Sequence, residues 1–115
     1  MKSSTAGQQA EAAVAAYLEQ AGYRVLDANW KTRFCEIDII AQRNEVIYFV
    51  EVKYRSKTSH GTGLEYITSQ KLKQMKFAAE LWNSFNHWDG DYRLMAAEVS
   101  GSDYQDVTIV EINSL

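Results

Sequence analysis

The sequence predicts an α/β fold in which a mixed β-sheet lies between helices. Apolar residues recur at helical spacing in two segments, and five segments rich in branched and aromatic residues indicate strands. One of these strands, residues 45–54, is apolar on both faces. Such a strand is central in its sheet and is covered on both sides, normally by helices. The predicted order is helix, three strands, helix, two strands, which gives a three-layer arrangement.

The first helix is predicted over residues 6–21, where alanine, valine and leucine side chains form one apolar stripe. Thr5 and Gln8 fit the capping-box pattern at its beginning. Gly22 can adopt the left-handed conformation that commonly ends a helix. A helix at this position would lie against the sheet through its apolar stripe.

Three strands are predicted next, over residues 23–29, 34–42 and 45–54. The second and third strands are close enough in sequence to form a hairpin. We assign Arg43 and Asn44 to its tight turn, because asparagine tolerates a positive φ. This assignment fixes which side chains of the two strands face each other.

The second half of the chain begins with a glycine-containing loop at residues 55–67. A helix is predicted over residues 69–86, with Thr68 as its N-cap and Ile67 as a hydrophobic staple. The chain then ends in two more predicted strands, at residues 91–100 and 106–113.

One domain accounts for residues 1–115, because this length is typical of a single domain and the chain is 46% apolar. No apolar run approaches the ~18 residues of a membrane span, and we expect no secretory signal because the N-terminal segment lacks an apolar core. The single cysteine, Cys35, excludes an internal disulfide framework. We therefore expect a cytoplasmic protein.

The net charge of −3 argues against strong nonspecific binding to nucleic acid by the chain as a whole. The charge is unevenly distributed, however. The segment Lys53–Lys76 carries six basic residues and one acid, a charge of +5, whereas the rest of the chain carries −8. A basic segment in an acidic protein indicates either a local site for a polyanion or an ordinary solvated surface.

Charged residues interrupt the apolar strands. Glu51 and Lys53 stand two positions apart in the central strand, so they share a face of the sheet. Asp38 interrupts the neighbouring strand in the same way, among isoleucines. Burying a charge is costly unless it is paired or bound to a metal, so these residues are candidates for a functional site.

The predicted hairpin brings these residues to one face. With the turn at residues 43 and 44, Asp38 faces Phe49, and Glu36 faces Glu51. Directly opposed residues share a face, so Asp38 and Glu51 become diagonal neighbours about 7–8 Å apart at the backbone, with Lys53 beyond them. One additional residue in the turn would place Asp38 on the opposite face.

Carboxylates that converge on a half-buried face repel each other unless a cation lies among them. Their oxygen atoms suit Mg²⁺ or Mn²⁺ and not zinc. A cation held by Asp38 and Glu51, with Lys53 beside it, is suited to phosphodiester cleavage: the metal activates water and the lysine orients it or stabilises developing charge. The alternative is a structural cluster in which Glu51 pairs with Lys53, and Asp38 with Arg55 or Arg33.

The spacing of Asp38, twelve residues and then Glu51-Val52-Lys53 resembles the motif of the PD-(D/E)XK, or restriction-endonuclease-like, nucleases. More closely, the chain resembles the YraN family of small bacterial proteins, predicted endonucleases that are distantly similar to archaeal Holliday-junction resolvases. The similarity covers nearly the whole chain. Its most specific segments are Glu36-Ile37-Asp38 and Phe49-Val50-Glu51-Val52-Lys53-Tyr54-Arg55.

The resemblance implies a restriction-endonuclease-like three-layer fold and an endonuclease that uses Mg²⁺ or Mn²⁺ on DNA, branched or single-stranded. Asp38 and Glu51 would be the metal ligands, Lys53 the catalytic lysine, and Glu11 an acidic residue contributed by the first helix. We expect the DNA backbone to contact a further set of polar and basic residues: Arg55, Lys57, Gln70, Lys71 and Lys73.

Two positions depart from the family's pattern. Cys35 stands where the family usually has glycine, and Met95 where the family tends to have an acidic residue. These departures keep open an alternative function, a nucleic-acid-binding or scaffold module that has the same fold but no catalytic activity. A homodimer is a further expectation, because a small nuclease often needs a second copy to cut two strands.

Overall fold

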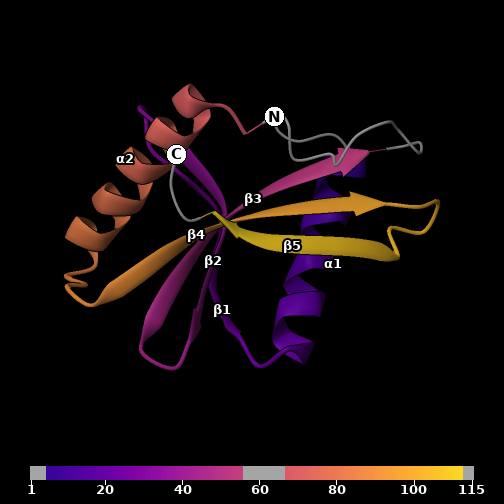
Figure 1. The fold of residues 1–115 in the computed structure, drawn as a ribbon, viewed down its shortest axis with the longest axis horizontal. Helices are drawn as coiled ribbons and strands as arrows, with labels where there is room; N and C mark the ends of the chain where they lie inside the picture. The colour runs from indigo at the N-terminus through magenta and orange to yellow at the C-terminus, as the bar shows by residue number, and fades with distance from the viewer. Residues whose placement is uncertain (1–4, 56–66, 113–115) are drawn as a thin grey trace.

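The computed structural model describes residues 5–55 and 67–112 (Figure 1). Two helices and five strands follow the predicted order. They are α1 (Thr5–Gln20), β1 (Arg24–Lys31), β2 (Glu36–Arg43), β3 (Val46–Arg55), α2 (Ser69–Phe85), β4 (Asp91–Ser100) and β5 (Asp106–Ile112). The predicted loop at residues 55–67 falls largely on residues 56–66, which lie outside the described residues, as does Lys57.

The five strands form one mixed sheet in the order β1-β2-β3-β4-β5, with β3 in the centre. β3 and β4 are parallel, and the other neighbouring pairs are antiparallel. A parallel pair needs a long crossover connection, and α2 lies within the one between β3 and β4. The α/β class and the central position of the 45–54 strand are therefore confirmed.

The two helices cover opposite faces of the twisted sheet (Figure 1). Val14 and Leu18 of α1 pack in one apolar cluster with Val50 of β3. Leu72 and Trp82 of α2 pack in a second cluster with the neighbouring β3 residue, Phe49. Alternate side chains of β3 thus enter opposite clusters, which explains why this strand is apolar on both faces. Neither helix in the described residues is long and apolar enough to cross a membrane.

The turn between β2 and β3 differs from the predicted one. Arg43 pairs with Val46, so the turn residues are Asn44 and Glu45, and the assignment of Arg43 to the turn is wrong. Asn44 has a φ of 56°. Asparagine tolerates this left-handed conformation better than most residues, so it takes the first position of the turn and Arg43 remains in the strand.

The corrected turn shifts the pairing of β2 with β3 by two residues. Ile40 pairs with Phe49 and Ile39 with Val50, so Asp38 does not face Phe49 as predicted and lies beyond the last backbone pair of the two strands. A shift by two keeps the predicted faces along the paired part of the strands. At Asp38 the alternation is interrupted, because Ile37 packs in the α2 cluster and Ile39 in the α1 cluster. The position of the Asp38 carboxyl group therefore follows from its side-chain contacts and not from the strand pairing alone.

Thr68 caps α2 as predicted: its side chain accepts a hydrogen bond of 3.1 Å from the backbone N–H of Lys71. Ile67 packs against the α2 cluster, as expected of a hydrophobic staple.

We expect Thr68→Ala to lower the free energy of unfolding by about 1 kcal/mol, because it leaves one N–H of the first turn without its acceptor. Urea denaturation measures this change. Thr68→Ser should remain near the wild-type value, and an unchanged Thr68→Ala would contradict the role of the cap.

Candidate active site

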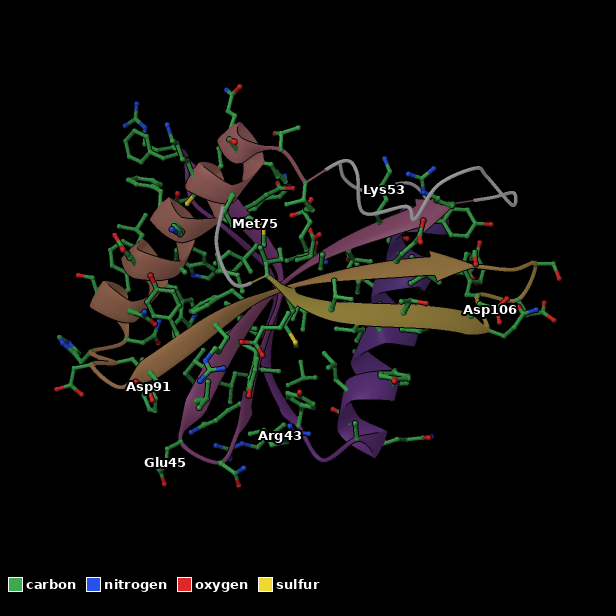
Figure 2. All side chains as sticks on the ribbon, in the orientation of Figure 1. Arg43, Glu45, Lys53, Met75, Asp91 and Asp106 are labelled. Atoms are coloured by element: carbon green, nitrogen blue, oxygen red, sulfur yellow. The ribbon has the colours of Figure 1, made fainter. Side chains whose placement is uncertain are left out.

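The candidate residues gather along the C-terminal half of β3. Glu51 is half-buried and Lys53 is exposed. Figure 2 shows Lys53 near the end of β3 that is far from the turn, where Arg43 and Glu45 are labelled. In this half of the strand, alternate residues on the α2 face are charged instead of apolar, so the face changes from a core surface to a polar one.

The Asp38 carboxylate lies between β2 and β3. Its Oδ2 accepts a hydrogen bond of 2.8 Å from the backbone N–H of Val52. The backbone pairing of the two strands extends only to Ile39 and Val50, so beyond this point a side-chain oxygen takes the place of a backbone acceptor. The hydrogen bond fixes the Asp38 carboxylate beside the backbone of β3, one residue beyond Glu51.

Burial raises the pKa of Asp38 from 3.8 to about 7, and repulsion from Glu51 is the next cause. The hydrogen bond from Val52 acts in the opposite direction. Glu11 and Glu36 raise the pKa further. Acidic residues from α1, β2 and β3 are therefore close enough to repel one another, and the position of Asp38 favours a bound proton or a cation.

Glu11 faces the sheet, as its place on the predicted helix allowed. Its Oε1 accepts a hydrogen bond of 2.9 Å from Asn29 Nδ2 of β1. Asn29 has a φ of 55° and lies between the Ala28 and Trp30 pairings with β2, directly across from Asp38. Asn29 therefore orients Glu11 toward the acidic cluster. Asn29 was not among the site residues predicted from the sequence, although a polar side chain within a strand was the available signal.

Glu51 forms an ion pair with Lys71, with 3.0 Å between Oε2 and Nζ. The ion pair joins β3 to the first turn of α2. It differs from the Glu51–Lys53 pair proposed in the structural alternative. Both residues line a cleft of about 540 Å³ between α2 and the sheet. The other residues that line this cleft are Phe34, Cys35, Glu36, Gln70, Lys73, Gln74, Met75 and Phe77.

Three of the residues predicted to contact DNA line this cleft, namely Gln70, Lys71 and Lys73. Arg55 instead forms an ion pair with Glu98 of β4. The structural alternative had paired Asp38 with Arg55 or Arg33. Of the predicted binding residues that the structure describes, Gln70, Lys71 and Lys73 thus lie in the first turns of α2 and Arg55 lies at the end of β3.

Within residues 5–55 and 67–112, no three His, Cys, Asp or Glu side chains are grouped closely enough to form a ready-made metal site. Mg²⁺, however, keeps several water ligands and commonly takes only one or two carboxylates from the protein. Asp38 and Glu51 supply two, and the repulsion from Glu51, Glu11 and Glu36 that adds to the effect of burial on the pKa of Asp38 is what a cation would relieve. The residues present therefore fit a hard divalent cation.

Cys35 and Met95, the two residues that depart from the family pattern, both have contacts that explain their positions in the fold. Cys35 follows Phe34 in a turn, where its backbone N–H donates to Thr32 Oγ1 at 3.2 Å, and it lines the cleft. Met95 is only 4% exposed and packs in the α1 cluster with Val50. Met95 thus lies on the face of the sheet away from the cleft, where an apolar side chain contributes to the core.

The comparison with known proteins gives the family. A family model described as "Uncharacterised protein family UPF0102" matches residues 10–110. The chain belongs to the UPF0102 family. This is the YraN family that the sequence motifs resemble, and the UPF0102 match spans the acidic residues of α1, β2 and β3.

Individual UPF0102 proteins from distant bacteria resemble the chain over most of its length. A UPF0102 protein of Vibrio parahaemolyticus is 39% identical over 101 residues, which cover 84% of each chain. One of Shewanella loihica is 35% identical over 104 residues, 90% of this chain and 91% of the relative. One of a Sulfurihydrogenibium species is 40% identical over 87 residues, 75% and 76% of the two chains.

Proposed function

We propose that this UPF0102 protein is a metal-dependent endonuclease that hydrolyses phosphodiester bonds in DNA, with a restriction-endonuclease-like fold. The observation that supports this most strongly is the Asp38 carboxyl group, whose pKa rises to about 7 through burial and the nearby acids Glu51, Glu11 and Glu36. A fold gains no stability from gathering like charges, so such clusters are concentrated at functional sites.

In this proposal Asp38 and Glu51 hold the divalent cation. When bound, the cation polarises the phosphate and lowers the pKa of a water ligand. Glu11, oriented by Asn29, adds negative charge from the α1 side. Lys53 lies two residues beyond Glu51 on the same face, where its ammonium group orients the attacking water or stabilises charge that develops on the phosphate.

The DNA backbone lies along the beginning of α2. Gln70 and Lys71 are in its first turn, where the helix dipole and backbone N–H groups favour a phosphate. Lys73 lines the same cleft. In this arrangement Lys71 neutralises Glu51 in the absence of metal, and a bound cation takes over that role so that Lys71 can contact phosphate.

The same ion pair favours a second candidate function. Because Lys71 already neutralises Glu51 at 3.0 Å, the cluster can be stable without metal. The chain would then be a nucleic-acid-binding or scaffold module with the fold of a nuclease and no catalytic activity. Such a module would bind DNA in a salt-dependent way and leave it intact.

Incubation of the purified protein with branched, single-stranded and duplex DNA distinguishes the two functions. We expect cleavage products with Mg²⁺ or Mn²⁺ and none with a chelator, because the carboxylates cannot activate water without the cation. Salt-dependent binding with no cleavage in either metal would favour the binding module. The absence of both binding and cleavage would contradict both functions.

A further inference from the structure

The cleft beside Glu51 has exposed phenylalanine rings on two of its walls. Phe34 is 72% exposed and lies in the turn between β1 and β2. Phe77 is 52% exposed and lies on α2. Both line the cleft of about 540 Å³ that also contains Glu51 and Lys71. Scattered exposed apolar residues need no explanation, but two aromatic rings on one cleft beside the candidate active site form a specific surface.

The turn that carries Phe34 is well ordered by hydrogen bonds. Thr32 Oγ1 accepts hydrogen bonds from the backbone N–H groups of Phe34 and Cys35, at 3.0 and 3.2 Å. The backbone N–H of Thr32 donates to the Cys35 carbonyl at 2.9 Å. The guanidinium of Arg33 lies 5.4 Å from the centre of the Phe34 ring. The ring is therefore held out toward solvent by its own turn, with a cation beside it.

Phe77 is placed on the cleft by the period of α2. Gln70, Lys73 and Gln74 precede it by seven, four and three positions, so the four side chains form one stripe along the helix. The apolar stripe that faces the core is separate. This wall of the cleft thus carries polar and basic side chains together with an aromatic ring. Proteins that bind single-stranded nucleic acid use the same combination.

From this geometry we infer that Phe34 and Phe77 form a stacking platform for an unpaired nucleotide next to the bond to be cleaved. The inference rests on the proposed function and narrows its substrate to single-stranded or locally unpaired DNA. A base has a π-face that can stack on a phenylalanine ring, and the basic side chains Lys71 and Lys73 can contact the adjoining phosphates. A continuous duplex keeps its bases stacked on each other and does not offer one to the platform.

Binding of fluorescent single-stranded oligonucleotides, measured in a chelator so that no cleavage occurs, tests this inference. We expect Phe34→Ala and Phe77→Ala each to weaken binding by about 10-fold, because each removes one stacking surface. Phe85→Ala is the matched control: Phe85 is 60% exposed on the same helix but outside this cleft, and its loss should change binding less than about 2-fold.

A second readout separates stacking from a general loss of contact. An oligonucleotide carrying 2-aminopurine should lose fluorescence when it binds to the wild-type protein or to Phe85→Ala. It should retain its fluorescence with the double variant that combines Phe34→Ala and Phe77→Ala. An abasic strand should bind the wild type and the double variant equally. Equal affinity of the wild type for normal and abasic strands would overturn the inference, as would an equal loss of duplex binding in the phenylalanine variants.

The inference and the proposed function can fail independently. Phenylalanine-dependent binding with no cleavage in any metal would contradict the nuclease and leave the platform standing. Metal-dependent cleavage with no effect of either phenylalanine on oligonucleotide binding would contradict the platform and leave the nuclease standing.

Discussion

Lys53→Ala is expected to lower the rate of Mg²⁺-dependent DNA cleavage by about 100- to 1,000-fold, the usual effect of removing one group that stabilises charge in a transition state. Lys53 is exposed on the polar half of β3, so its truncation should leave the core intact. The rate is measured under single-turnover conditions with saturating protein, so that a change in DNA affinity does not enter the result.

Arg24→Met provides a matched control for the loss of one positive charge. Arg24 is exposed at the other end of the sheet, where it contacts Gln42. This variant should cleave at the wild-type rate, and the unfolding midpoints of both variants should match that of the wild type. A Lys53→Ala variant that cleaves as fast as the wild type removes Lys53 from the mechanism.

Asp38→Asn should make the protein more stable above pH 7 while it abolishes metal-dependent cleavage. The pKa of Asp38 is raised from 3.8 to about 7 in the fold, so the folded state binds more protons than the unfolded chain between these values. Stability of the wild type therefore falls as the pH rises through this window. The full change corresponds to about 4 kcal/mol, so we expect a gain of about 2 to 4 kcal/mol for Asp38→Asn near pH 8.

Urea denaturation as a function of pH measures this effect. Asparagine retains an oxygen that can accept the Val52 N–H, so the substitution removes the charge and keeps the shape of the site. Asp106→Asn, an exposed strand position, is the control and should follow the wild-type curve. If the free energies of unfolding of Asp38→Asn and the wild type differ by the same amount at every pH, the raised pKa of Asp38 is contradicted. Gain of stability together with loss of activity is the pattern expected of a functional residue.

The fold was largely predictable because each element carries its own pattern. The apolar stripe of α2, the Thr68 cap and the two apolar faces of β3 all indicate the same layered arrangement, and the structure confirms it. The position of the β2–β3 turn was wrong by one residue, because Asn44 suits more than one turn position. That small difference shifts the pairing of β2 with β3 by two residues, so Asp38 does not face Phe49.

The candidate site was only partly predictable. Residue types and strand alternation indicated Asp38 and Glu51 as partners, since both are local properties. The hydrogen bond of Asn29 to Glu11 and the ion pair of Lys71 with Glu51 depend on how α1 and α2 pack on the sheet. Contacts of that kind are set by tertiary structure, and a single sequence has no local signal for them.

The central claim is that Asp38 and Glu51 together bind one divalent cation, and a crystal soaked in Mn²⁺ tests it most directly through the anomalous signal of the metal. We expect a peak about 2.1 Å from one oxygen of each carboxylate, with Lys71 moved away from Glu51. A soaked crystal with no peak at this position, in which Glu51 still pairs with Lys71, would contradict it.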